Sequence, residues 1–391
     1  MFFFALLAGE VALGTIAYVV AYELTRTDDP LGRRALSLVP VVILSFAWAV
    51  TYKALGYGAS GALMYIDPFS QPLDWVKAVL TRGPVLLGAL FAGFWGEVWT
   101  VTPPDGRAGL IIVSVIATAL FLFGLWRASR TMEPHLRRRV AWMSLGAVLS
   151  VLPVTSTFPS ARLLLVPSLG ALVAVALVIQ HAWRAKSLRP PGLAAGAGAA
   201  VLVLLHVVLA VPQWGFGYAL MHFAGQKSDR MHAAVMSQVD VARLSDTRLV
   251  TLSSDPLSAM NAGARLSLET GTAPRAWWLL SIAHGEHVFT RPGRSSLEME
   301  LAAADKRLLA SEAELFLRPP PTPMPERESL PGMRVEVAER DHAGIKRLRF
   351  DFDVPLEDPS LILFHFEDRE LKRLTPPAVG TRWTEKEPPI L

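Results

Sequence analysis

The chain has 391 residues, of which 52% are hydrophobic and only 18% are charged, and it contains no cysteine. Soluble domains carry about 25% charged residues, so this composition indicates a membrane protein; the lack of cysteine excludes disulfides, thiolate catalysis and cysteine-ligated metals. The net charge of +4 arises from short clusters beside apolar segments, such as Arg137–Arg139, which is typical of membrane topology and argues against nucleic-acid binding.

Long apolar runs dominate the chain up to about Gln213, and charged residues return beyond it at the density of a soluble protein. A membrane-spanning helix needs about 20 mostly apolar residues. Six segments meet this condition and are predicted to cross the bilayer. They are Phe2–Tyr22, Leu36–Tyr52, Ala108–Trp126, Val140–Thr155, Leu163–Trp183 and Leu193–Val211.

A seventh apolar stretch, Pro84–Val101, is short, contains Glu97 and is rich in Gly and Trp. Lys and Arg of short loops stay in the cytoplasm, and the basic loops all lie inside only if this stretch does not cross. We therefore predict that it is a re-entrant or interfacial segment, preceded by a short interfacial helix at Asp74–Arg82. The loop before it, the amino terminus and the carboxyl-terminal domain are then extracytoplasmic, on a bacterial-type inner (plasma) membrane.

The pattern predicts three parts: a transmembrane helical domain at residues 1–213, a connecting amphipathic helix at 214–236, and a small β-rich extracytoplasmic domain at 237–391. The last part contains strand-like segments separated by Pro, Gly, Asp and Ser. The predicted strands are Arg248–Ser253, Ala276–Ser281, Arg334–Glu339, Lys346–Val354 and Ser360–Phe366. One helix is predicted at Leu297–Phe316, and a small β sandwich is the expected fold.

Charged groups in apolar segments are candidates for function because burying them in hydrocarbon costs a few kcal/mol. Glu10 lies in the first predicted span, between Ala8 and Gly14. It could bind a cation, a substrate or a proton, or it could be hydrogen-bonded near a helix end. Arg162 lies at the outer mouth of the fifth span, against the usual distribution of positive charge. Its guanidinium could hold a lipid-linked phosphate, or it could be an interfacial anchor.

Asp67 and Asp74 lie in the outward-facing loop and could serve as a base or as metal ligands. Asp67 is followed by proline, which is equally the usual start of a turn, and this interpretation is favoured for it. The segment His284–His287 has the wrong spacing for the HExxH zinc motif. No metal site is predicted.

Three segments together resemble a known class of membrane enzyme. They are the Ala8–Gly14 part of the first span, the Tyr57–Pro68 loop, and the Phe158–Gly170 segment with Arg162, Pro167 and Ser168. This combination resembles the carboxyl-terminal half of bacterial GT-C-type glycosyltransferases, similar to protein O-mannosyltransferases. Aliphatic residues replace the aromatic ones usual after the arginine, and Ala161 stands where an acid is common. The acidic first loop that carries catalysis in that class is missing, so the resemblance implies either that the amino-terminal catalytic half is absent from this chain or that the fold has lost the activity.

The resemblance implies a protein that handles a polyprenyl-phosphate-linked sugar at the outer face of the membrane, with Arg162 on the phosphate side. No cofactor is expected, although a glycosyltransferase could use a divalent cation. The expected partners are membrane lipid and that lipid-linked sugar. The alternative is a non-catalytic anchor that presents the β-rich domain to an envelope protein. A transporter is the third hypothesis, disfavoured because Glu10 and His206 are the charged or histidine groups that lie away from the ends of the six predicted spans.

Overall fold

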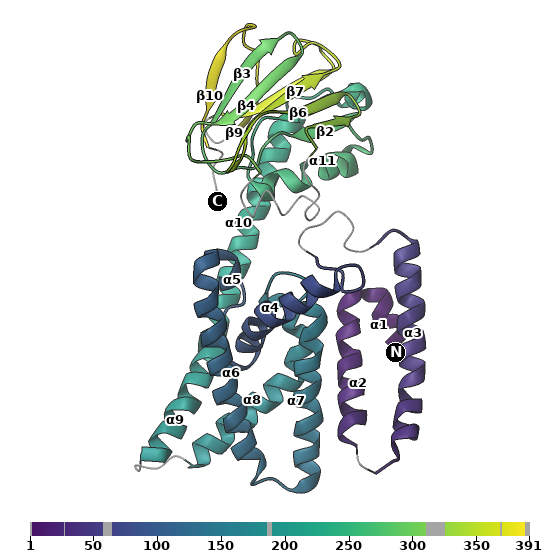
Figure 1. Ribbon diagram of the computed structural model, residues 1–391, viewed down its shortest axis with the longest axis vertical. Helices are drawn as coiled ribbons and strands as arrows, with labels where there is room; N and C mark the ends of the chain where they lie inside the picture. The colour runs from purple at the N-terminus through teal and green to yellow at the C-terminus, as the bar shows by residue number, and fades with distance from the viewer. Residues whose placement is uncertain are drawn as a thin grey trace. The chain divides into compact units, whose positions relative to one another are not determined.

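The computed structural model describes residues 2–26, 28–57, 65–185, 190–309, 325–367 and 370–387. The chain forms two compact units, Met1–Trp214 and Gly215–Leu391 (Figure 1). The first unit is helical. The second is built around β-sheets, so the predicted division into a helical part and a β-rich part is confirmed at this level.

The helical unit contains the following elements up to the start of the long helix α10. They are α1 Phe2–Ala8, η1 Glu10–Leu13, α2 Gly14–Thr25, α3 Leu31–Ala54, α4 Pro72–Ala92, α5 Val98–Val101, η2 Pro104–Gly106, α6 Arg107–Ser129, α7 Pro134–Val154, η3 Ala161–Leu164, α8 Leu165–Ala185, α9 Pro190–Val203, the π-helical η4 Leu204–Val208, and α10 Ala210–Met236.

Among the described residues, five helical segments are long and apolar enough to cross a membrane: Leu31–Ala54, Pro72–Ala92, Arg107–Ser129, Ala161–Ala185 and Gly192–Met236. These segments support a multi-pass membrane protein. The helix α7 is also 21 residues long, but its first turns carry Arg137–Arg139 and it is not one of the five. The predicted number of six crossings stays a prediction.

The first predicted span is not one continuous helix. Residues 2–8 form α1, the chain breaks at Gly9, and the helix resumes through η1 into α2. Gly9 has φ 153°, a conformation that side chains other than glycine rarely adopt. The apolar run predicted a single helix because its mean hydropathy takes no account of a backbone break at one glycine.

The predicted division between an interfacial helix and a re-entrant Pro84–Val101 segment is wrong. A single helix, α4, runs through Pro84 and ends at Gly93, which adopts the left-handed conformation with φ 76°. Its second half is buried, and Phe91 stacks on Phe121 of α6 with ring centroids 4.8 Å apart. Proline removes one helical hydrogen bond, but this packing stabilises the helix through the proline.

Small residues allow α7 to pack closely with α8 on one side and with α2 on the other. A Cβ atom added at Gly170 would lie 2.1 Å from the carbonyl oxygen of Met143, and one added at Gly146 would lie 2.4 Å from the Tyr18 ring. The Tyr18 hydroxyl donates to the carbonyl oxygen of Val166 at 2.9 Å and accepts from the amide of Gly170 at 2.9 Å. Close backbone approach through small residues is a usual basis of helix association in membranes.

The β unit contains ten strands in its described residues, together with η5 Val241–Asp246 and the helix α11 Pro256–Thr270. The strands are β1 Arg248–Thr251, β2 Ala276–Leu279, β3 His287–Gly293, β4 Ser296–Leu301, β5 Arg327–Leu330, β6 Met333–Asp341, β7 Gly344–Phe352, β8 Leu361–Glu367, β9 Glu370–Arg373 and β10 Arg382–Glu385.

These strands form two sheets (Figure 1). The four-stranded sheet has the order β2-β1-β8-β9, in which β1 is parallel to both β2 and β8. The six-stranded sheet has the order β10-β3-β4-β7-β6-β5 and is antiparallel. Helix α11 connects β1 to β2, as a parallel pair requires a crossover connection.

Alternate residues of β1 face two different cores. Val250 packs with Phe289, Phe350 and other residues between the two sheets. Leu249 packs on the opposite face with Leu266 of α11 and Val235 of α10. The β unit is therefore a sheet-on-sheet sandwich with helices over the outer face of the smaller sheet.

The prediction of a helix at Leu297–Phe316 is wrong for residues 297–309, which are the part of this range that the structure describes. Residues 296–301 form strand β4, with Leu297 and Met299 buried in the sandwich core, and turns follow up to residue 309. Residues 310–316 lie outside the described part. The Leu, Ala and Glu content favours a helix locally, but antiparallel pairing with β3 and β7 on both sides stabilises the strand.

Candidate functional site

The loop between α7 and α8, residues 155–160, is where three distant segments of the helical unit meet. The amide of Ile66 donates to the carbonyl oxygen of Ser156 at 2.7 Å. Arg82 of α4 donates through Nη1 to the carbonyl oxygen of Thr155 at 3.2 Å. The segment after α4 reaches the loop through the carboxylate of Glu97. We call this end of the helical unit the loop-155 end.

Glu97 holds the start of the helix that continues into α8. Its Oε1 accepts hydrogen bonds from Ser160 Oγ at 2.8 Å and from the amide of Ala161 at 2.9 Å. Ala161 is the first residue of η3, so the carboxylate lies at the positive end of a helix and satisfies a backbone donor that has no partner within the helix. Gly96 lies directly against this helix start, since a Cβ atom there would lie 3.4 Å from the Ala161 nitrogen.

Arg162 follows directly and presents its guanidinium to the outside of the unit. Its side chain is exposed, and the guanidinium carbon lies 5.9 Å from the centroid of the Phe158 ring. Within the described ranges no carboxylate pairs with it. A guanidinium without a carboxylate partner keeps its five N–H donors for an oxyanion, and its planar fork can bind two oxygens of a phosphate with two parallel hydrogen bonds.

Asp67 is brought to the same end, because its neighbour Ile66 is bonded to the α7–α8 loop. Its carboxylate is already engaged: Oδ2 accepts from Lys53 Nζ at 2.8 Å and Oδ1 from the amide of Phe69 at 2.9 Å. The hydrogen bond from Lys53 lowers the pKa of Asp67 below its ordinary value. A carboxylate held in this way shapes the turn and is a poor general base.

Asp74 and Glu10 are not joined to these residues by any contact in the described part of the chain. Asp74 is exposed in the first turn of α4, where a negative charge is stabilised by the helix dipole. Glu10 is the first residue of η1, next to the break at Gly9, and its side chain lies outside the described part.

Glu97 is the residue that sequence reasoning did not propose as a site. Its position in an apolar stretch is the available signal, because a carboxylate there indicates a functional or anchoring role. The partner of the carboxylate, an amide 64 residues further along the chain, could not be deduced from the sequence.

His206 lies in the π-helical turn η4, a feature often found at functional sites. Its Nδ1 is 3.1 Å from the carbonyl oxygen of Leu202, and a Cβ atom at Gly93 would lie 3.2 Å from its Cε1. Its Nε2 is buried without a hydrogen-bond partner in the described residues. One of the two ring nitrogens therefore has a hydrogen-bond partner in the described residues, while the ring packs against the end of α4.

In the β unit, His287 is completely buried and its Nε2 lies 2.8 Å from Ser281 Oγ. Burial lowers its pKa from 6.5 to about 4. His284, three residues earlier, instead lies 3.6 Å from a carboxylate oxygen of Glu387. The described residues contain no group of three or more His, Asp or Glu side chains placed to hold a metal ion.

Comparison of the chain with protein-family models, curated proteins and solved structures finds no match.

Proposed function

We propose that this protein is a membrane protein that binds a lipid-linked sugar phosphate at its loop-155 end, in the manner of the GT-C-type glycosyltransferases that the sequence resembles. The observation that carries the proposal is the exposed guanidinium of Arg162, which has no carboxylate partner in the described residues. Glu97 supports it by fixing the helix start from which this guanidinium projects.

The proposal places the loop-155 end outside the cytoplasm. The arginine clusters Arg33–Arg34 and Arg137–Arg139 lie in the first turns of α3 and α7, at the other ends of these helices, and the cytoplasmic side carries such excess charge. The phosphate of a polyprenyl lipid lies at the membrane surface, where an arginine at the start of a span can reach it. The sugar would then lie outside the bilayer, on the side to which the predicted topology assigns the exposed carboxylate of Asp74.

Binding of polyprenyl phosphate to the purified full-length chain in lipid nanodiscs tests the proposal, with native mass spectrometry as the readout. Arg162→Gln should weaken binding by about tenfold, which corresponds to ~1.4 kcal/mol. Arg162→Lys keeps the charge but loses the planar fork and should weaken it by roughly two- to fivefold. Arg139→Gln, at the other end of α7, is the matched control and should bind like the unaltered chain.

Equal binding by the Arg162→Gln chain and the unaltered chain would contradict the proposal. A separate assay distinguishes a transferase from a binding protein: the chain is incubated with a polyprenyl-phosphate hexose, and release or transfer of the hexose is measured. Loss of transfer in Asp74→Asn, with binding retained, would identify Asp74 as the catalytic base. Binding without any transfer would identify a non-catalytic member of this structural type.

A second candidate function, a membrane anchor that presents the β unit to an envelope protein, is favoured by one observation. Among the described strands, β5 pairs with β6 alone, at the edge of its sheet, and all four of its residues are exposed. An open sheet edge can accept a strand from another chain. A photo-crosslinking residue at Ser329 should then give a defined adduct in intact membranes, whereas one at exposed Leu268 should not; equal labelling at both positions would refute this role.

A further inference from the structure

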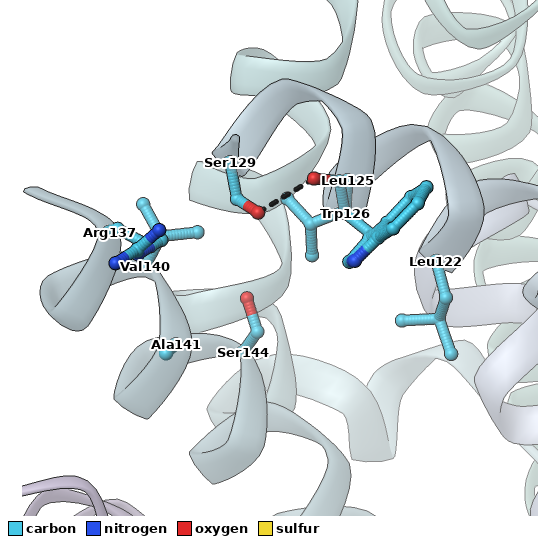
Figure 2. A pocket seen from close by; sticks show the side chains of 8 residues that line it. All are labelled: Leu122, Leu125, Trp126, Ser129, Arg137, Val140, Ala141 and Ser144. Carbon is cyan, nitrogen blue, oxygen red and sulfur yellow. Dashed lines mark hydrogen bonds between the residues drawn. The ribbon is translucent and has the colours of Figure 1, made fainter. Parts of the chain in front are cut away.

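A groove between α6 and α7 lies at the arginine-rich end of the helical unit, opposite the loop-155 end (Figure 2). Its volume is about 190 Å³. The walls are apolar and come from both helices: Leu122 and Leu125 from α6, and Val140 from α7. Trp126 and Arg137 also line it, so the groove combines hydrocarbon walls with a cationic mouth.

The groove contains one polar group that the protein does not satisfy. Ser144 Oγ is buried and has no hydrogen-bond partner among the described residues. Figure 2 shows this hydroxyl directed toward the space below Ser129 and Leu125. The Ser129 hydroxyl, in contrast, donates to the carbonyl oxygen of Trp126 at 2.8 Å. A buried hydroxyl without a partner is costly, so an acceptor supplied by a ligand would stabilise it.

The charge at the mouth of the groove is not neutralised by the protein. Arg137 is exposed, and no carboxylate pairs with it in the part of the chain that the structure describes. Its neighbour Arg138 differs, because it pairs with Asp28 at 3.1 Å. Arg130 lies over the Trp126 ring at 3.9 Å from its centroid and adds a second positive charge beside the groove.

The two polar groups lie at different depths on the same face of α7. Arg137 and Ser144 are seven residues apart on α7, which corresponds to a rise of about 10 Å along the helix. The headgroup layer of one leaflet is roughly 5–8 Å thick between the phosphates and the hydrocarbon. The Cα separation exceeds this thickness by a few Å, which the long, flexible Arg137 side chain can span by extending along the helix toward Ser144. A phosphate at its guanidinium then leaves the ester carbonyl oxygens of the same lipid within reach of the Ser144 hydroxyl.

We infer that this groove is a binding site for an anionic phospholipid, with the phosphodiester at Arg137, an ester carbonyl at Ser144, and an acyl chain along Leu122, Leu125 and Val140. Charge complementarity favours an anionic lipid over a zwitterionic one, because basic pockets between helices recognise anionic headgroups. The inference does not depend on the proposed sugar-lipid function, since Arg162 lies beyond the opposite end of α7.

The experiment uses the full-length chain purified in a non-ionic detergent and titrated with dioleoyl phosphatidylglycerol or dioleoyl phosphatidylcholine, with bound lipid counted by native mass spectrometry. Phosphatidylglycerol should bind at least about fivefold more tightly, or ~1 kcal/mol. Arg137→Gln should remove this preference. Arg139→Gln is the matched control, because Arg139 is also exposed on α7 but does not line the groove, and it should change binding less than about twofold.

Two further measurements separate this site from simpler explanations. Ser144→Ala should weaken both lipids by about twofold, because an ester carbonyl is common to both. Inorganic phosphate should not displace the lipid. The inference is overturned if the two lipids bind equally, if Arg139→Gln has the same effect as Arg137→Gln, or if inorganic phosphate competes, since the last result would indicate a site for free anions.

Discussion

Lowering the pH from 7 to 5 should loosen the β unit, because His287 is buried there as a neutral imidazole. Its side chain is 0% exposed, its Nε2 lies 2.8 Å from Ser281 Oγ, and its ring stacks on Phe289 with centroids 6.2 Å apart. Burial holds its pKa at about 4, below the ordinary value of 6.5. Protonation of this ring in the folded state would place a positive charge among apolar neighbours.

The direction of the effect follows from proton binding. An unfolded chain protonates its histidine near pH 6.5, whereas the folded chain does not protonate His287 until about pH 4. Between these values the unfolded chain binds more protons, so this contribution to stability is complete above pH 6.5 and is lost as the pH falls toward 4. The full difference is about 3 kcal/mol, of which about 2 kcal/mol falls between pH 7 and 5.

Hydrogen exchange of β3 and β4 in the purified full-length chain measures this loss. The open population of these strands should rise roughly 20-fold from pH 7 to pH 5, after correction for the intrinsic exchange rate. In His287→Gln this rise should be much smaller. His342→Gln, on the exposed turn between β6 and β7, is the matched control and should behave like the unaltered chain. If His287→Gln retains the full pH dependence, the buried imidazole is not its source.

Three other outcomes are expected. Gly170→Ala would place a Cβ atom 2.1 Å from a carbonyl oxygen of α7 and should destabilise the helical unit by about 1–3 kcal/mol. Gly198→Ala is the control, because a Cβ atom there has nothing within 4 Å, and it should not destabilise the unit. Thermal unfolding in detergent compares the two variants. Phe289→Ala removes a fully buried ring and should cost about 3–5 kcal/mol in urea unfolding, whereas Leu268→Ala at an 84% exposed position should cost less than ~0.5 kcal/mol. In this cysteine-free chain, a cysteine introduced at Ser129 should react only with a reagent on the cytoplasmic side; reaction from outside would refute the proposed orientation.

Hydropathy predicted the helical segments but not how they break or join. The predicted Ala108–Trp126 and Leu163–Trp183 spans correspond to helical segments Arg107–Ser129 and Ala161–Ala185. The segment around Pro84 was divided in two because proline and glycine interrupt helices locally. Burial of Leu86 and Phe91 under neighbouring helices keeps α4 continuous there. Such packing depends on residues far away in the chain, and a single sequence does not contain it.

The sequence predicts the position of Arg162 but not the contacts around it. Arg162 is at the start of a span-length helix, as its position in the sequence indicated. The pairing of Asp67 with Lys53 and the capping of Ala161 by Glu97 were not foreseen. Both are contacts across loops, and their formation depends on which helix ends lie side by side.

The position of β1 has a consequence for how the β unit is made by the ribosome. This strand lies inside its sheet, and its amide at Arg248 donates to Ser360, a residue 112 positions later. Until that residue has been synthesised, β1 has one open edge and the apolar side chains on both of its faces lack part of their cover. Contacts so distant in sequence form slowly. Newly made chains should therefore need protection from aggregation until β8 has emerged, and an assembly factor acting on this unit would bind before that moment.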